Sequence, residues 1–444
     1  MRFPHPLALL AGCIVLAAGL TYVLPAGRYQ RRDDPVTGRS VVISGTYAPV
    51  PRTPVGPFQA VVAIPKGMED AASVIFLVFL VGGAFTVVEK TGALRRAVMA
   101  LVDALDQRES LVIPVSCMAF AVGGALENMQ EELIAFVPLL VLLVRRLGFD
   151  SITAVAMSLG AAAVAAAFSP INPFQVQIAQ KIAELPLGSA QGFRTITMIL
   201  AVALWTWGVM RHAHRTRTAP EKVELNTGEG LGARGSAILM VVLLAFAVLV
   251  FGILRLGWEL DELSALFFLM GVITGLIGGL GINGTVEGFV EGFRSMALAA
   301  LLIGFARAIS VVLEEGQIID TIVYRLSAPL ASLPTALSAI GIMGVEGAIH
   351  VPVPSVSGEA VLTLPVLVPL SDLLGLSRQI TVLAYQYGAG LCELLTPTNG
   401  ALMAMLVAAG VPFERYLKFA IPLVAVMVGF AMLCLVAALA VGLR

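Results

Sequence analysis

The sequence predicts an all-α, polytopic membrane protein made of two inverted repeats. Three observations lead to this fold class: a very apolar composition, an internal repeat, and Pro- and Asn-containing interruptions inside apolar runs. Each repeat is expected to contain a re-entrant helical hairpin and a broken transmembrane helix.

Composition establishes the membrane class. The chain has 444 residues, of which 58% are hydrophobic and 13% charged, against about 25% charged in soluble proteins. Each of the apolar runs is near the roughly 20 residues that a membrane span needs; the clearest are 7–25, 237–254, 263–281 and 420–442. The formal net charge of −1 points to no nucleic-acid partner. Neither a Walker loop nor a nucleophile elbow is present, and "GLGING" at 279–284 lacks the strand context of a dinucleotide site.

Lys and Arg residues set the predicted orientation. The basic segments are assigned to the cytoplasm: 90–108, 145–146, 211–234, and turns at Arg294, Arg415 and Lys418. The outer loops carry isolated bases: Arg194, Arg255, Arg325 and Arg378. The Pro/Gly-rich segment 26–66 is expected outside, and the N-terminus inside, in the inner membrane of a bacterium. This divides the chain into a first half (1–210), a cytoplasmic linker (211–236) and a second half (237–444).

The first predicted hairpin covers 110–144. Arg108 and Arg145 are both assigned inside, and the two apolar arms between them, 110–125 and 133–144, are too short to span about 30 Å each. A hairpin that enters and leaves on the cytoplasmic side fits these lengths. Its tip is "LENMQEEL" at 126–133.

An internal repeat links the two halves. A gapless shift of 227 residues aligns 132–173 with 359–400, with eleven of forty-two positions identical. "SPINP" at 169–173 thereby meets "TPTNG" at 396–400, so Asn172 aligns with Asn399. Because proline interrupts a helix, each stretch predicts a broken transmembrane helix, over 152–185 and 380–411.

The second hairpin is predicted over 334–370, with arms 334–349 and 360–370 around the tip "HVPVPSVSGE" at 350–359. The loop after it has one Arg and an Asp, which places it outside. One hairpin therefore opens inward and the other outward. Inverted repeats with interrupted segments at corresponding places are the best sequence indication of a secondary transporter.

The two breaks and two tips are expected to converge on one cavity near the membrane midplane. Half-helix N-termini suit a carboxylate, and carbonyl, Ser, Thr and Asn oxygens suit a small cation such as Na⁺. Na⁺ could bind at the Asn172 and Asn399 breaks, and no other metal is expected. The candidate substrate- or ion-binding residues are Asn128, Glu131, Glu132, Ser169, Asn172, Ser357, Glu359, Glu393, Thr396, Thr398 and Asn399.

Several polar and ionisable residues have two possible roles. Arg307, inside an apolar run, could clamp a carboxylate or form a structural ion pair. His350 could carry a proton or serve as a hydrogen-bonded tip residue. Glu132 and Glu359 could complement a helix dipole, and the two Asn residues could simply cap the breaks. Glu127 and Glu346 are the remaining acids near the tips.

Several motifs resemble one transporter family. They are "LPAGRY" (24–29), "VGPFQA" and "IPKGME" in the outer segment, "SPINPFQVQIAQ" (169–180) and "LTPTNGALMAMLVAAGVPFERYLKF" (395–419). They are similar to the YfcC-like branch of the four-carbon-dicarboxylate anaerobic carrier (DcuC-like) family, within the ion transporter superfamily. The resemblance implies a homodimeric elevator-type carrier. Where the dicarboxylate carriers have Ser-Asn-Thr, this chain has Ser-Pro-Ile-Asn and Thr-Pro-Thr-Asn, so the cargo does not follow from the resemblance.

The acidic excess at the predicted cavity favours a cationic cargo. We expect a secondary active transporter of a small charged organic solute, either an exchanger or an ion-coupled symporter, and a basic amino acid such as arginine or ornithine fits best. The alternative is a Na⁺- or H⁺-coupled carrier of four-carbon dicarboxylates, and a channel is more remote. No catalytic pair predicts an enzyme. The only expected cofactor is Na⁺ or H⁺ as the coupling ion.

Overall fold

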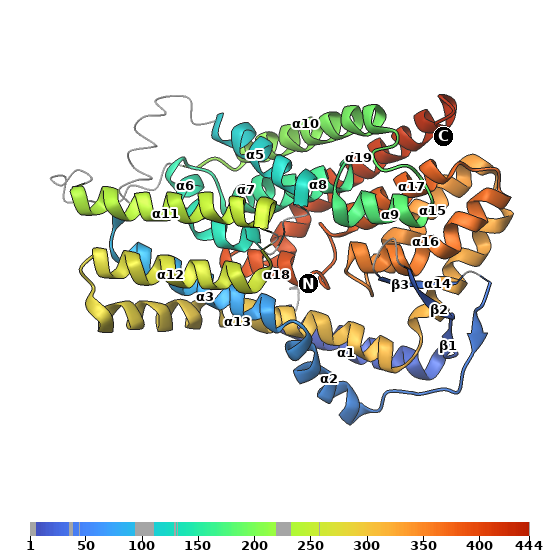
Figure 1. Cartoon of the computed structure of the whole chain (residues 1–444), viewed down its shortest axis with the longest axis horizontal. Coiled ribbons are helices and arrows are strands. Elements are labelled where there is room, and N and C mark those ends of the chain that lie inside the picture. The colour runs from blue at the N-terminus through green and yellow to red at the C-terminus, as the bar shows by residue number, and fades with distance from the viewer. Residues whose placement is uncertain are drawn as a thin grey trace.

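The computed structural model describes residues 6–34, 39–43, 45–93, 111–127, 130, 132–218, 232–256 and 258–443. Helices dominate it (Figure 1), which confirms the prediction of a helical polytopic protein. Six helices among the described residues are long and apolar enough to cross a membrane. They are α3 (Ala72–Lys90), α10 (Gln191–Arg215), α12 (Leu260–Ile277), α13 (Gly281–Glu315), α16 (Val356–Leu373) and α19 (Phe413–Ala440).

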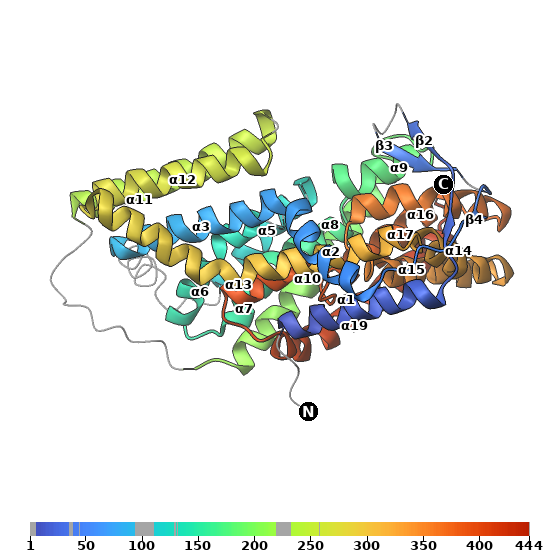
Figure 2. The same ribbon diagram turned by 90° about the horizontal axis from the view of Figure 1, so that it is seen from below.

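One group of helices packs around α13, and we call this group the framework. Besides α3, α12 and α13 it contains α1 (Pro6–Val23), α2 (Pro57–Asp70) and α11 (Ala233–Phe251), which continues as the π-helical turn η5 (Gly252–Leu256). Figure 2 shows α3 between α12 and α13, and α3 contacts both. Gly292 of α13 lies against the backbone of Gly82 and Gly83, so a side chain there would separate α13 from α3.

Helix α13 corrects one feature of the predicted topology. Arg294 was expected to mark a basic turn, but it lies within the continuous 35-residue helix Gly281–Glu315. The chain reverses earlier, at Gly279 and Gly281, whose positive φ angles of 79° and 67° suit glycine. A single arginine within a long apolar helix is therefore compatible with an unbroken helix.

The regions predicted as the first hairpin and the first broken helix are both helical. The hairpin region contains α5 (Val112–Glu127), the 3₁₀ turn η2 (Glu132–Phe136) and α6 (Val137–Arg146). The broken helix consists of α7 (Ser151–Val155), the π-helical η3 (Ala156–Gly160) and α8 (Ala161–Ala167), then η4 (Pro173–Gln177) and α9 (Ile178–Ile182).

The second half has corresponding elements. After α14 (Ile319–Ser327) and η6 (Ala328–Ser332) come the hairpin helices α15 (Thr335–His350) and α16, then α17 (Arg378–Cys392) and α18 (Gly400–Ala408). The hairpin tip is shorter than expected, because α16 begins at Val356 rather than at residue 360. The Ser355 hydroxyl accepts a bond from the Gly358 amide and so starts this helix early. Ser357 and Glu359 are thus helical residues.

Positions aligned by the internal repeat have similar local structure. Gly148 and Gly375 both have positive φ angles, 80° and 66°, directly before the broken helices. Asn172 and Asn399 both cap the helix after a break by accepting backbone amide bonds.

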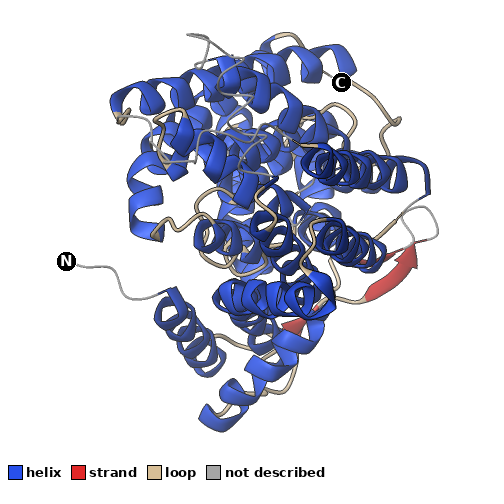
Figure 3. Ribbon diagram, turned by 90° about the vertical axis from the view of Figure 1, so that its left-hand side faces the viewer, coloured by secondary structure: helices blue, strands red, loops and turns tan. Residues whose placement is uncertain are grey.

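The segment between α1 and α2 forms four short strands. They are β1 (Gly27–Arg28), β2 (Arg31–Asp34), β3 (Arg39–Val42) and β4 (Ala48–Pro49), paired antiparallel as β1–β4 and β2–β3. Figure 3 shows the strands at one edge of the helical bundle. Asp320 of α14 binds the Tyr29 amide at 2.9 Å and the Arg31 guanidinium at 2.7 Å, which fastens this segment to the helices.

Candidate functional site

A cavity of about 260 Å³ lies where the second break, both hairpin tips and α13 meet. We call it the central cavity. Its polar lining includes Gln130, Arg307, Ser310, Glu314, Ser355, Ser357, Glu393, Thr398 and Asn399. Phe174, just after the first break, also lines it. Residues distant in the sequence thus surround one small space.

The second break presents its polar groups to this cavity. Asn399 Oδ1 accepts a bond from the Leu402 amide at 3.0 Å, which caps α18. Gly400 and Ala401 line the cavity, so the N-terminus of α18 faces it. The Thr396 and Thr398 hydroxyls are 2.7 Å apart, and Thr398 donates to the Val351 carbonyl of the second hairpin tip at 2.6 Å. The break is therefore tied to that tip.

Gln130 joins the first hairpin tip to the second break. Its Nε2 donates to Glu393 Oε2 at 2.5 Å, and its Oε1 accepts from Asn399 Nδ2 at 3.0 Å. The residues predicted to bind from this tip are different ones, namely Asn128, Glu131 and Glu132. Asn128 and Glu131 lie outside the described residues, and Glu132 begins η2. The polar tip itself was the available signal, but only the fold shows which of its residues reaches the cavity.

The first break is arranged differently. Asn172 is fully buried, and its side chain accepts bonds from the Phe174 and Gln175 amides and donates to the Gly124 carbonyl, each at 2.9 Å. Ser169 Oγ donates to the Ala125 carbonyl and accepts from the Asn172 amide. Neither side chain lines the central cavity. These contacts are those of a cap, and a solute-binding role for the pair stays a prediction.

Two residues that were not predicted support the first break, one from each half. Gln386 of α17 donates to the Ala166 and Ser169 carbonyls, both at 3.0 Å, so it binds oxygens freed by the interruption. Its Oε1 accepts a bond from Arg194 at 2.5 Å. Arg194 was expected in an outer loop, but it lies fully buried in the first turn of α10. A lone Gln in the apolar run "LAYQYGAG" was the visible signal.

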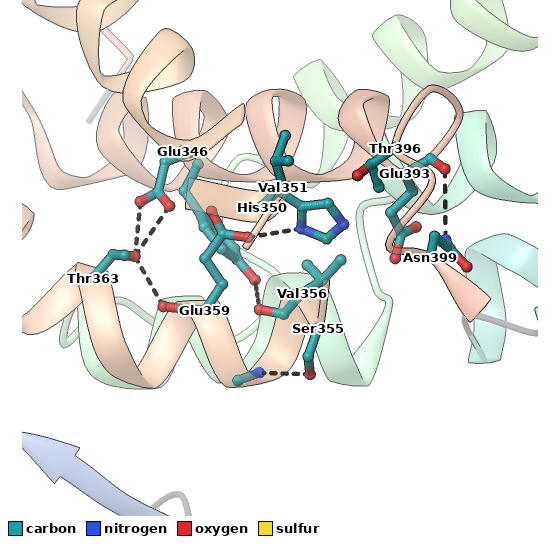
Figure 4. A network of polar contacts seen from close by, with 12 residues as sticks. Glu346, His350, Val351, Ser355, Val356, Glu359, Thr363, Glu393, Thr396 and Asn399 are labelled. Carbon is teal, nitrogen blue, oxygen red and sulfur yellow. Dashed lines mark hydrogen bonds and ion pairs between the residues drawn. The ribbon is translucent and has the colours of Figure 1, made fainter. Parts of the chain in front are cut away.

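A buried polar cluster lies behind the second tip (Figure 4). His350 Nδ1 is 2.8 Å from Glu359 Oε2, and the Thr363 hydroxyl donates to Glu346 at 2.8 Å. All four side chains are completely buried. Ser357 lines the central cavity, whereas Glu359, two residues later on α16, is turned toward His350. Glu359 is therefore next to the cavity without lining it.

Arg307 lies between the central cavity and a second, wider cavity of about 480 Å³. This vestibule is bounded by the β strands, α14 and the second hairpin, and Arg28, Arg31 and Asp320 are among its lining residues. Arg307 Nε is 3.4 Å from Asp70 Oδ2, and both side chains are 44% exposed. Its structural pair is thus an aspartate of α2, in a geometry that leaves the guanidinium accessible to solvent.

The second break has the oxygen chemistry that a small hard cation requires. Thr396, Thr398, Glu393 and the Val351 carbonyl gather there, whereas Asn172 and Ser169 already accept backbone amide bonds. Among the described residues, no group of three or more His, Cys, Asp or Glu side chains could hold a metal ion. Na⁺ at either break stays a prediction.

Comparison with known proteins decides the family. The sequence matches the family model of the C4-dicarboxylate anaerobic carriers over residues 3–440. The chain belongs to the C4-dicarboxylate anaerobic carrier family. It is 32% identical to the Escherichia coli protein named "Putative basic amino acid antiporter YfcC", over 82% of this chain and 76% of that protein. It is also 28% identical to an uncharacterised Haemophilus influenzae protein, over 95% of this chain and 94% of that one.

Two solved transporter structures have a weaker likeness to this carrier. The Alcanivorax borkumensis YdaH transporter aligns with a TM-score of 0.46 and 16% identity, over 99% of both chains. The Neisseria gonorrhoeae efflux pump MtrF aligns with a TM-score of 0.42 and 16% identity, over 98% of this chain and 95% of that one.

Family membership confirms the resemblance inferred from the sequence motifs. This carrier is a multi-pass membrane transport protein and not an enzyme, because the matching family is one of carriers. Family membership does not by itself identify the transported solute, because the family description and the name of the Escherichia coli relative refer to different solutes.

Proposed function

We propose that this carrier is a secondary active exchanger of a basic amino acid such as arginine or ornithine. The observation that carries the proposal is the charge of the central cavity. Two carboxylates, Glu393 and Glu314, line it, and the one basic side chain among its described lining residues, Arg307, is already near Asp70. A cavity with an acidic excess stabilises a cationic solute.

The groups around the cavity match both ends of such a solute. The N-terminal amides of α18 and the Arg307 guanidinium can donate hydrogen bonds to the α-carboxylate. Glu393 can pair with the cationic side chain of the solute. Gln130 bonds to both Glu393 and Asn399, the cap of α18, so the carboxylate lies near the N-terminus of that helix. Thr398 and Ser310 supply hydroxyls for the amino group.

The relatives favour this cargo but leave a second candidate. The name of the Escherichia coli relative, at 32% identity, refers to basic amino acid antiport. The family description names four-carbon dicarboxylates instead. Arg307 and the α18 N-terminus are two anion-binding features within one cavity, and they would serve a dicarboxylate if the carboxyl group of Glu393 were protonated.

The transport movement that we propose is an elevator. The shared capping roles of Asn172 and Asn399, and of the glycines before each break, support two inverted repeats. The helices that bear the breaks and hairpins would move against the framework, and the contact between α13 and α18 beside the cavity would then slide. An inner-membrane location with a cytoplasmic N-terminus, and a homodimeric assembly, complete the proposal.

Uptake into proteoliposomes tests the cargo. Labelled L-arginine and labelled succinate are offered under imposed pH or Na⁺ gradients. We expect saturable arginine uptake that ornithine inhibits, and at least a tenfold weaker apparent affinity in Glu393→Gln. The matched control is Glu287→Gln, an exposed carboxylate of α13 outside both cavity linings. Succinate uptake without arginine uptake would replace this proposal with the dicarboxylate carrier.

A further inference from the structure

The cluster behind the second hairpin tip is built from two facing helices. Glu346 and His350 are one turn apart on α15, and Glu359 and Thr363 are one turn apart on α16. The bonds between them form two rungs, Glu346 with Thr363 and His350 with Glu359 (Figure 4). His350 Nε2 turns into the cluster without a hydrogen-bond partner in the described part of the chain, and the Glu359 carboxyl group lies within hydrogen-bond reach of the Glu346 carboxyl group.

The charges in this cluster do not balance. Facing Glu359 are Glu346 and His350 from α15, Cys392 at the end of α17, and Glu393 just after it. Among the described residues, no Lys or Arg forms an ion pair with Glu346 or Glu359, and His350 is the partner of Glu359. Two adjacent carboxylates buried without a cation are too costly to be ionised together. At least one proton must therefore reside in the cluster.

The cluster also communicates with the central cavity. Glu393 lines the cavity and interacts electrostatically with Glu359. Val351, the residue after His350, accepts the hydrogen bond from Thr398 of the second break. A change of one charge at Glu359 therefore acts on the carboxylate that lines the solute cavity.

We propose that Glu346, His350 and Glu359 form the binding site of the coupling proton. The proton binds a Glu359 carboxylate oxygen. His350 Nδ1 shares it across the rung at 2.8 Å, and Glu346 shares it through its direct contact with the Glu359 carboxyl group. The direction of coupling between proton and solute rests on the proposed function. A cationic solute at Glu393 and a proton on Glu359 repel each other, so the two bind alternately. Loading a basic amino acid releases the proton, which makes the carrier a proton exchanger.

The first test requires no solute. Infrared difference spectra between acid and alkaline pH are recorded for the reconstituted full-length protein. We expect the absorption of a buried protonated carboxyl group that disappears on alkaline titration and is missing in Glu359→Gln. Thr363→Val removes the hydroxyl that donates a hydrogen bond to Glu346, and it should shift this band. This second variant keeps the test valid if Glu359→Gln fails to fold. A spectrum unchanged in both variants would overturn the proton site.

The second test concerns coupling. The Kd of L-arginine is measured between pH 5 and 8. In the wild type, binding should weaken as the pH falls, by up to about tenfold per unit where the proton competes. In Glu359→Gln this dependence should be lost, whereas Glu287→Gln should retain it. A steep dependence that survives in Glu359→Gln would contradict the coupling role.

The two tests separate the two proposals. If neither wild type nor variant binds arginine, the assignment of cargo fails while the infrared band still decides the proton site. Succinate then serves as the probe, and because it is an anion its binding should tighten as the pH falls.

Discussion

Asn172 and Asn399 show how one residue type performs one local role in two surroundings. Both accept a backbone amide bond at the start of a helix that follows a break. The Nδ2 of Asn172 then binds a backbone carbonyl of α5, whereas the Nδ2 of Asn399 binds the Gln130 side chain beside Glu393. The first amide is structural in every contact, and the second borders the cavity.

Alanine substitution should separate these roles. Asn172→Ala leaves the Gly124 carbonyl and two amides without partners in a buried site, which costs roughly 1–3 kcal/mol for each unsatisfied group. We expect a clearly lower melting temperature for Asn172→Ala, and solute affinity near that of the wild type in the protein that remains folded.

Asn399→Ala should weaken solute binding more than it lowers stability. It removes the bond to Gln130 at the cavity wall and one cap bond to the Leu402 amide, so arginine binding should weaken about tenfold or more, with a smaller loss of stability than in Asn172→Ala. Thermal melting and equilibrium binding on both variants decide the matter. Equal binding losses in the two variants would return Asn172 to the solute site.

The sequence predicts where helices break, but it does not predict which distant residues contact the breaks. The combination of Pro with Asn locates both breaks, because proline disfavours a continuous helix and Asn caps the segment that follows. Proline alone would not have located them, since α16 continues through Pro365 and Pro369. The combination does not reveal that Gln130 bridges Glu393 and Asn399, or that Gln386 binds the carbonyls of the first break. The residues of such pairs are far apart in the sequence: Arg194 and Gln386 are separated by 192 positions, and Gln130 and Asn399 by 269. Only tertiary packing brings them together.

At the scale of elements, the second hairpin shows what local chemistry adds to hydropathy. The apolar pattern alone places its second arm at 360–370, whereas α16 runs from Val356 to Leu373 and contains Pro365 and Pro369. The Ser355 cap and the acidic Glu359 in the first turn favour the earlier start. The outer segment 26–66 was likewise expected only as a loop, yet Pro57 opens α2.

The packing of α15 on α17 yields a matched pair of variants. Gly388 of α17 faces the Met343 backbone carbonyl so closely that a Cβ would overlap it, whereas Gly344 of α15 has no atom within 4 Å of such a Cβ. Gly388→Ala should therefore lower the melting temperature by several degrees, and Gly344→Ala should leave it unchanged or raise it slightly. Similar melting of the two proteins would show that the helices are less closely packed than this.

At the scale of the whole molecule, the central cavity forms where the two halves and the framework meet. The first half contributes Gln130 and Phe174, the second half contributes the break and the second tip, and α13 closes the other side. Hydropathy and the repeat predict a helical carrier with paired interruptions. They do not predict the buried acid cluster behind the second tip, because the aligned Glu132 has no histidine nine residues before it in its own half.

A cross-link tests the elevator movement. A Cβ placed at Gly400 would lie 3.5 Å from the Cβ of Ile303, which suits a disulfide between α18 and α13. In a background without Cys13, Cys117, Cys392 and Cys434, oxidised Ile303→Cys/Gly400→Cys should lose uptake and regain it on reduction. The two single variants are the controls. Full uptake by the cross-linked protein would mean that these helices do not move apart.

Counterflow in proteoliposomes tests the central claim most directly, because only a carrier with a solute site exposed alternately to the two sides exchanges solute. Vesicles containing the wild-type protein are preloaded with unlabelled L-arginine and diluted into labelled L-arginine. The account predicts transient accumulation of label above equilibrium, faster than in empty vesicles and strongly reduced in Glu393→Gln. Equal rates of label entry into preloaded and empty vesicles would contradict it.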